Sequence, residues 1–191
     1  MRNAKGFTLI ELLAVIIIST TVLVPLLSGL IGNFEVNKRM HARKAASSIT
    51  LTTLSAFEKV HFDNLDNQLG DDLIVEITQN DCDEFTFDVD NPYRIMPSDE
   101  VCMMIFEQEW NSIQFTGEET FKVFLYPYHL TENEIDTILG MESVPDRVKN
   151  EIDELTPSDD TDEDILRMSV WIEYDEDSGQ DIAASGVVSR E

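Results

Sequence analysis

Hydrophobic residues dominate the beginning of the chain and later give way to short alternating runs. From Phe7 to Ile31 the sequence carries one charged residue, Glu11. About 20 consecutive apolar residues suffice for a helix to cross a bilayer, so this run predicts a transmembrane helix. A secretory signal peptide has a shorter apolar stretch of roughly 7–15 residues before its cleavage site. The run here is longer, which favours a segment that stays attached.

The helical pattern continues beyond the apolar run. Between Ala42 and Val60, small and apolar residues recur at steps of three and four and form one stripe. A continuous helix from Phe7 to Phe62 would be roughly 84 Å long at 1.5 Å per residue. We expect its second half to pack on the rest of the chain, and the polar segment after Phe62 to end it with turn residues.

Short apolar runs in the remainder predict strands separated by polar turns. Thr131 and Glu134 form a capping-box pattern that begins one helix, with Gly140 as its stop, and a second short helix is expected after Pro145, so that two helices lie within about 131–155. The predicted strands are Leu73–Thr78, Phe85–Val89, Val101–Phe106, Phe121–Tyr126, Leu166–Tyr174 and Ile182–Val188, the last two as a hairpin. In the fifth strand, one face is formed by Leu166, Met168, Val170 and Ile172. The predicted fold class is therefore α+β, with a long N-terminal helix packed on an antiparallel sheet.

Charge is very unevenly distributed along the chain, whose formal net charge is −25. Up to Phe62 there are seven Lys or Arg and three Glu, so the remaining residues hold six basic and 35 acidic side chains, a net charge of −29. Such a domain is repelled by nucleic acid and by anionic lipid. We therefore expect no direct nucleic-acid binding.

Glu11 is the residue in the apolar run that most needs an explanation. An ionisable group within a membrane costs at least a few kcal/mol unless it is paired or reaches the interface. A Glu that extends to the interface is the simple alternative to a functional one. Pro25 removes one backbone hydrogen bond inside the same helix, which predicts either a plain kink or a segment that can unwind.

The first residues resemble a known family. The short basic leader "MRNAKG", the sequence "FTLIE" and the long apolar helix are similar to the N-terminus of type IV prepilins and type II secretion pseudopilins. The resemblance is confined to roughly the first 30 residues. The acidic remainder has only the general layout of a pilin head, and its size is typical of a minor subunit.

This resemblance implies a processing site and an assembly residue. Prepilin peptidase would cleave between Gly6 and Phe7 on the cytoplasmic side and N-methylate Phe7. Glu11 would pair with the positive amino terminus of a neighbouring subunit, because an ion pair in a low-dielectric bundle is favoured over either charge alone. The implied partners are other pilin or pseudopilin subunits, prepilin peptidase and membrane lipid. The implied location is the cytoplasmic (inner) membrane, with the N-terminus in the cytoplasm and the head outside, and then the pilus or pseudopilus.

The basic residues on both sides of the apolar run do not settle this orientation. More Lys and Arg follow the run, among them Lys38, Arg39, Arg43 and Lys44, than precede it. Long domains are translocated largely regardless of charge, so we give the motif more weight than this count.

Two cysteines, Cys82 and Cys102, fit one disulfide bond or two buried thiols, and no zinc site. Acidic residues cluster at 158–164 and 175–181, where Asp175, Asp177 and Asp181 are weak candidates for calcium ligands and a solvated surface is the default. Tyr126, Tyr128 and the two tryptophans could form a binding patch, although core packing is commoner. No catalytic motif is present, so we predict no enzyme and no required cofactor.

The sequence thus predicts a leader at 1–6, a transmembrane or filament-core helix at 7–31, an amphipathic continuation at 32–62 and an acidic head at 63–191. The predicted function is a structural subunit of a type IV pilus or a type II secretion pseudopilus. The alternative is a membrane protein with one span and an acidic ligand-binding or sensor domain. Cleavage after Gly6 distinguishes the two.

Overall fold

The structure is a computed structural model that describes residues 9–81, 99–106, 108–110, 113–115, 120–160, 164–175 and 179–190. The chain divides into two compact units, Met1–His41 and Ala42–Glu191. The second unit is called the head below. Gly6, Phe7 and the predicted strand Phe85–Val89 lie outside the described residues.

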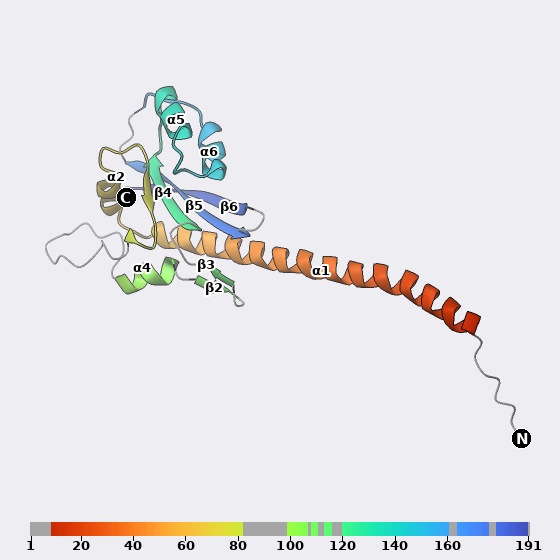
Figure 1. Ribbon diagram of the computed structural model, residues 1–191. Coiled ribbons are helices and arrows are strands. Elements are labelled where there is room, and N and C mark those ends of the chain that lie inside the picture. The colour runs from red at the N-terminus through yellow and green to blue at the C-terminus, as the bar shows by residue number, and fades with distance from the viewer. Residues whose placement is uncertain are drawn as a thin grey trace, which may run out of the picture. The chain divides into compact units, whose positions relative to one another are not determined.

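A single helix, α1 (Leu9–Phe57), forms the described part of the first unit and continues into the head (Figure 1). Every large hydrophobic side chain in it from Leu9 to Val36 is at least half exposed. By length and composition, α1 can cross a membrane. Its apolar surface is unfavourable in water, so it calls for lipid or other helices around it. The predicted α1 extends to Phe62, whereas the observed helix ends at Phe57.

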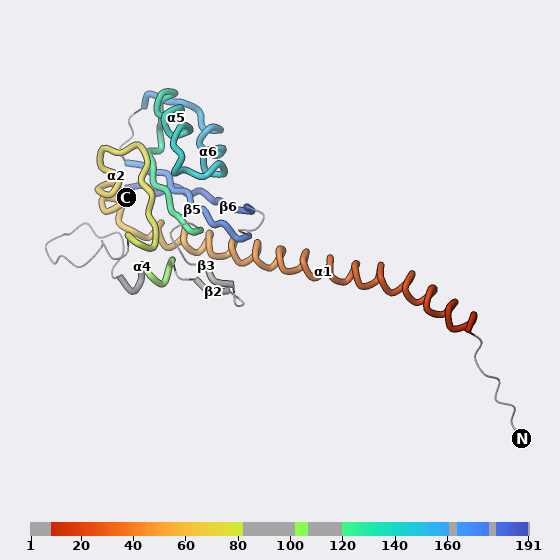
Figure 2. Tube along the Cα trace, viewed as in Figure 1, coloured from red at the N-terminus to blue at the C-terminus, as the bar shows by residue number. Residues whose placement is uncertain are grey.

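The head is built on a four-stranded antiparallel sheet with the order β1-β4-β5-β6. Figure 2 shows β5 and β6 running side by side as the predicted hairpin. A separate short hairpin joins β2 (Gln108–Trp110) and β3 (Ile113–Phe115), which the sequence pattern did not predict. The sheet strands are β1 (Val75–Ile77), β4 (Phe121–Pro127), β5 (Ile165–Asp175) and β6 (Gln180–Ser189).

Helices cover both faces of this sheet. The head portion of α1 packs on one face, while α5 (Glu132–Leu139) and α6 (Asp146–Asp153) pack on the other (Figure 1). Because successive side chains of a strand point to opposite faces, the buried residues of β4 and β5 divide between two cores. The face predicted for β5 is confirmed: Leu166, Met168, Val170 and Ile172 all belong to the core that includes α1.

One predicted strand is wrong. The segment Val101–Phe106 lies in a helix, α4 (Asp99–Phe106). Cys102, Ile105 and Phe106 are buried at helical spacing, whereas Met104 is 69% exposed. A short apolar run does not by itself distinguish a buried strand from a buried helix, and the acidic residues at the start of this one favour the helix.

The polar segment after α1 also differs from expectation. The sequence predicts only turn residues there, but α2 (Phe62–Leu69) forms a second helix. Phe62, Leu65 and Leu69 are buried in the core that includes α1. These three apolar residues recur at steps of three and four, and their burial outweighs the low helix propensity of the Asp and Asn residues between them.

The insertion of two helices is confirmed. The backbone N–H and the hydroxyl of Thr131 donate to Glu134 Oε2 at 2.7 and 2.8 Å, and the Glu134 N–H donates to Thr131 Oγ1 at 3.4 Å. This reciprocal capping box fixes the start of α5. Pro145 precedes α6 at its N-cap, so the first residue of that helix is Asp146.

Gly186 permits the close approach of β6 to α1. A Cβ atom at this position would lie 3.0 Å from Leu54 Cδ2 and 3.1 Å from Leu54 Cδ1. We expect Gly186→Ala to lower the free energy of unfolding of the head by roughly 1–3 kcal/mol, because it overpacks this contact.

The measurement is urea unfolding of the full chain in detergent micelles, with Ser189→Ala on the same strand as a control expected to change stability by less than about 0.5 kcal/mol. Leu54→Val should lower the free energy of unfolding by less in the Gly186→Ala variant than in the parent chain. Additive effects of the two substitutions would contradict the proposed contact.

Candidate functional site

The helix that carries the predicted assembly residue is exposed along its whole apolar part. Glu11 lies near the start of α1, with an exposed side chain, three residues into the described helix. Its predicted partner belongs to another subunit. The structure places Glu11 on an exposed part of α1. The ion pair between Glu11 and the amino terminus of another subunit stays a prediction.

Pro25 lies inside α1, and the helix is continuous on both sides of it. Proline has no N–H, so the carbonyl of Thr21, four residues earlier, loses its usual helical donor. The hydroxyls of the preceding turn donate back to the backbone: Thr21 Oγ1 to Ile17 O at 2.7 Å and Thr20 Oγ1 to Ile16 O at 3.0 Å. Such back-bonding is common in membrane helices and is associated with bending. Whether the segment kinks or unwinds stays a prediction.

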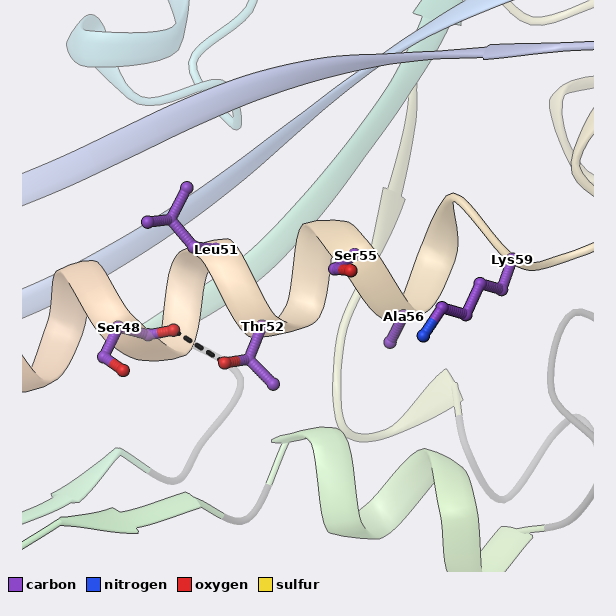
Figure 3. Close-up of a pocket in the computed structure, with 6 residues that line it drawn as sticks. All are labelled: Ser48, Leu51, Thr52, Ser55, Ala56 and Lys59. Atoms are coloured by element: carbon purple, nitrogen blue, oxygen red, sulfur yellow. Dashed lines mark hydrogen bonds between the residues drawn. The ribbon is translucent and has the colours of Figure 1, made fainter.

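A second exposed surface of α1 lies within the head. Five residues of the helix, together with one residue that follows its end, line a shallow hollow of about 440 Å³ (Figure 3). They are Ser48, Leu51, Thr52, Ser55, Ala56 and Lys59. The Thr52 hydroxyl donates to the Ser48 carbonyl at 2.8 Å, so it satisfies its own helix. Among the described residues that line this hollow there is no Asp, Glu or His.

The head contains a polar network between the sheet and α6, which is buried at Tyr126 and Ser169 and reaches the surface at Ser185. Tyr126 Oη lies 3.1 Å from Ser169 Oγ, which donates to Glu151 Oε2 at 3.1 Å. Ser185 Oγ lies 2.6 Å from Ser169 Oγ and also donates to Glu151 Oε2. Ser169 is fully buried and Tyr126 is 1% exposed. Because each buried polar group has a partner, the network positions α6 on the sheet, and it contains no cationic base.

Sequence reasoning missed this network because its members come from four separate elements. The aromatic patch considered for Tyr126 and Trp171 is instead core packing, since Trp171 is only 7% exposed. The Trp171 indole N–H donates to Asp181 Oδ2 at 2.7 Å. Tyr128 lies under the guanidinium of Arg167, whose Cζ is 4.1 Å from the ring centroid.

Arg190, near the C-terminus, was also missed. Its Nη2 lies 3.1 Å from Asp63 Oδ1 on α2, and its Nη1 lies 2.9 Å from Asp164 Oδ1 before β5. The guanidinium also lies over Phe62, with Cζ 4.8 Å from the ring centroid. These contacts join α2 to the start of β5 and the end of β6. An isolated Arg so close to the chain end carries no sequence signal for such a role.

The remaining predicted sites are partly outside the described residues. Cys102 is buried and 1% exposed, but Cys82 is not described, so the disulfide bond stays a prediction. Of the calcium candidates, Asp177 is not described and Asp181 accepts the Trp171 hydrogen bond. Among the described residues, no three His, Cys, Asp or Glu side chains are grouped so as to hold a metal ion.

Comparison with known protein families identifies a motif at the N-terminus. Residues 1–27 match the family model of the prokaryotic N-terminal methylation motif. This motif is the signature of type IV prepilins and pseudopilins, and it marks a pilin-like subunit that prepilin peptidase processes. The long apolar helix fits a membrane-anchored pilin, and the helix and antiparallel sheet form a pilin-like α+β arrangement. No curated protein and no solved structure matches the chain significantly.

The buried network predicts how the stability of the head depends on pH. Burial raises the pKa of Tyr126 above its ordinary value of 10.0, and the Glu151 carboxylate acts in the same direction, while the hydrogen bond with Ser169 opposes them. The unfolded chain therefore loses this proton at a lower pH than the folded head does. The stability that the neutral phenol contributes is fully present below about pH 10 and is lost as the pH rises through the raised pKa.

We expect the free energy of unfolding to fall more steeply between about pH 9.5 and 11 in the parent chain than in Tyr126→Phe. At pH 7 the substitution should cost about 1 kcal/mol or less, because Ser169 keeps its other partners. Tyr174→Phe, at an exposed hydrogen bond, is the matched control. Equal pH slopes for the parent and Tyr126→Phe would contradict the assignment.

Proposed function

We propose that this chain is a minor pilin or pseudopilin, a structural subunit that acts by assembly and not by catalysis. The observation that carries the proposal is the N-terminal methylation motif over residues 1–27. It is supported by α1, which exposes an apolar surface that only lipid or other helices can cover. The head adds no catalytic constellation among its described residues.

Processing is proposed to take place between Gly6 and Phe7. The short basic leader lies directly before the apolar run, as expected for a substrate that meets its peptidase at the membrane surface. Removal of the leader creates a new amino terminus at Phe7, which the same enzyme methylates. The mature helix then begins with a positive charge four residues before Glu11.

Glu11 is proposed to pair with the amino terminus of a neighbouring subunit. Either charge alone is costly in a low-dielectric helix bundle, whereas the pair is strongly attractive. A pair of this kind also fixes the axial register of two helices, because a shift along the axis separates the charges. The same residue thus favours entry into the filament and opposes a wrong register.

The head is proposed to lie outside the inner membrane, with the leader in the cytoplasm. The methylation motif requires the leader to meet a peptidase, and the leader charges are adjacent to the apolar run. An extracytoplasmic head folds where disulfides form, which suits the proposed bridge between Cys82 and Cys102.

Cleavage is tested with two substitutions at Gly6. Gly6→Val is expected to block processing, because a subsite sized for glycine rejects a branched side chain, while Gly6→Ala should be mild. Intact-mass analysis of the membrane form should show loss of Met1–Gly6 and gain of one methyl group in the parent and in Gly6→Ala. A full-length, unmethylated parent protein would favour the one-span sensor protein instead.

Assembly is tested at Glu11. Glu11→Gln is expected to leave cleavage and membrane insertion intact, because a neutral side chain enters the membrane more easily. Its recovery in sheared filaments should fall by about tenfold or more, since the partner amine then lacks its counter-charge in the assembled state. Glu35→Gln, on the same helix beyond the apolar run, is the matched control and should assemble normally. Normal recovery of Glu11→Gln would show that the residue only reaches the interface.

A further inference from the structure

A hollow of about 300 Å³ lies in the head where α2, the start of α5 and the segment before β5 meet. Its lining includes the apolar side chains of Leu69 and Leu166, which are buried, and the carboxylates of Asp159 and Asp160. Two further carboxylates of the lining already have partners in the same head: Asp66 Oδ2 lies 3.8 Å from Arg190 Nη2, and Glu134 accepts the capping-box hydrogen bonds of Thr131. Asp159 and Asp160 are exposed. The hollow therefore combines an apolar floor with an acidic rim.

This combination suits an extended organic cation better than a metal ion. No three metal-binding side chains within the described part of the chain are grouped around one point, so the carboxylates do not form a coordination shell. A Lys or Arg side chain instead buries an aliphatic stem against apolar surface and presents its charge to carboxylates. The acidic rim suits the charged group, and the apolar floor suits the aliphatic stem.

The chain itself contains a dense source of such side chains. Four of its 13 Lys and Arg residues fall within the seven residues from Lys38 to Lys44. All four are exposed on α1. They are Lys38, Arg39, Arg43 and Lys44. No other seven-residue stretch of the sequence is as basic.

The two basic residues that belong to the head, Arg43 and Lys44, are far from the hollow of the same head. Thirteen residues of helix separate Lys44 from the end of α1 at Phe57, a rise of about 20 Å. The helix α2, which supplies Asp66 and Leu69 to the hollow, lies beside that end of α1 (Figure 1). A side chain of Arg43 or Lys44 therefore cannot reach the hollow of its own head.

Building on the proposed assembly function, we propose that the hollow receives a basic side chain of the segment Lys38–Lys44 from a second copy of this chain. The contact is heterologous, because the two surfaces lie on different parts of the molecule. Contacts of this kind repeat without closing when the rotation between copies does not complete a ring, which gives a helical filament. The pairing also offsets part of the repulsion between heads that carry a strong net negative charge.

The test is photo-crosslinking in the native membrane, with the full chain carrying a photoreactive residue in place of Ser158, which lines the hollow. Two differently tagged copies are expressed together, and adducts are mapped by mass spectrometry. We expect a copy-to-copy adduct at the peptide that contains residues 38–44. Its yield should fall by about tenfold in Arg43→Glu/Lys44→Glu and in Asp159→Lys/Asp160→Lys, because like charges then face each other.

The two double substitutions combined should restore at least about half of the parent yield, since the charges are then exchanged. Matched controls change net charge equally at exposed or half-exposed positions elsewhere in the head: Arg147→Glu/Lys149→Glu and Asp153→Lys/Glu154→Lys. The adduct yield of these control variants should stay within about twofold of the parent yield.

An absent adduct at residues 38–44, or no recovery in the combined variant, would overturn the proposal. If Arg43→Glu/Lys44→Glu instead weakens binding of the chain to vesicles of anionic lipid and the combined variant does not restore it, the basic segment binds lipid headgroups. The intact mass of the same samples separates this failure from failure of the proposed function. A processed, Glu11-dependent filament without the adduct refutes the docking contact alone, whereas an unprocessed parent refutes the assembly function.

Discussion

The apolar surface of α1 is the constraint on which the rest of this protein depends. From Leu9 to Val36, every large hydrophobic side chain of α1 is at least half exposed. At about 25 cal/mol per Å² of apolar surface, exposure on this scale is incompatible with a helix free in water. This surface needs lipid or other helices around it, and the proposed assembly would transfer it from the first to the second. Glu11 interrupts this surface, and its proposed pairing with a neighbouring subunit would favour the helix environment over lipid.

The same helix acts as a core element once it reaches the head. From Ala42 onward one stripe of α1 is buried against the sheet, and Gly186 lets the facing strand come close to Leu54. The opposite stripe stays exposed and carries no charge between Lys44 and Glu58. One helix thus joins a segment with an exposed apolar surface to a segment with one stripe buried in the head. The change occurs where small residues such as Ala45 and Ala46 replace the large aliphatic ones.

Much of this architecture could be predicted, and the failures have physical causes. The long helix, the β5–β6 hairpin and the capping box at Thr131 were correct because each depends on local periodicity or local hydrogen bonding. The helix at Val101–Phe106 was mistaken for a strand because six apolar residues fit both structures. The helix α2 was missed because three buried side chains decide its conformation against the preference of its polar residues. The burial of α2 depends on contacts with segments distant in the sequence, such as the C-terminal segment that contains Arg190.

The candidate sites also divide into those that the sequence predicts and those that it does not. Gly6, Phe7 and Glu11 form a contiguous motif, so a short sequence identifies them, even though two of the three lie outside the described residues. The network of Tyr126, Ser169, Ser185 and Glu151 has no sequence signal, because no two of its members come from the same element. That network nevertheless has a consequence for assembly. Since α5 and α6 cover the sheet face opposite α1, buried polar contacts as well as apolar ones hold the insertion that shapes one side of the acidic hollow. In the proposed assembly, this packing fixes the shape of the surface that the head presents, and Glu11 on α1 fixes the axial register of the helices.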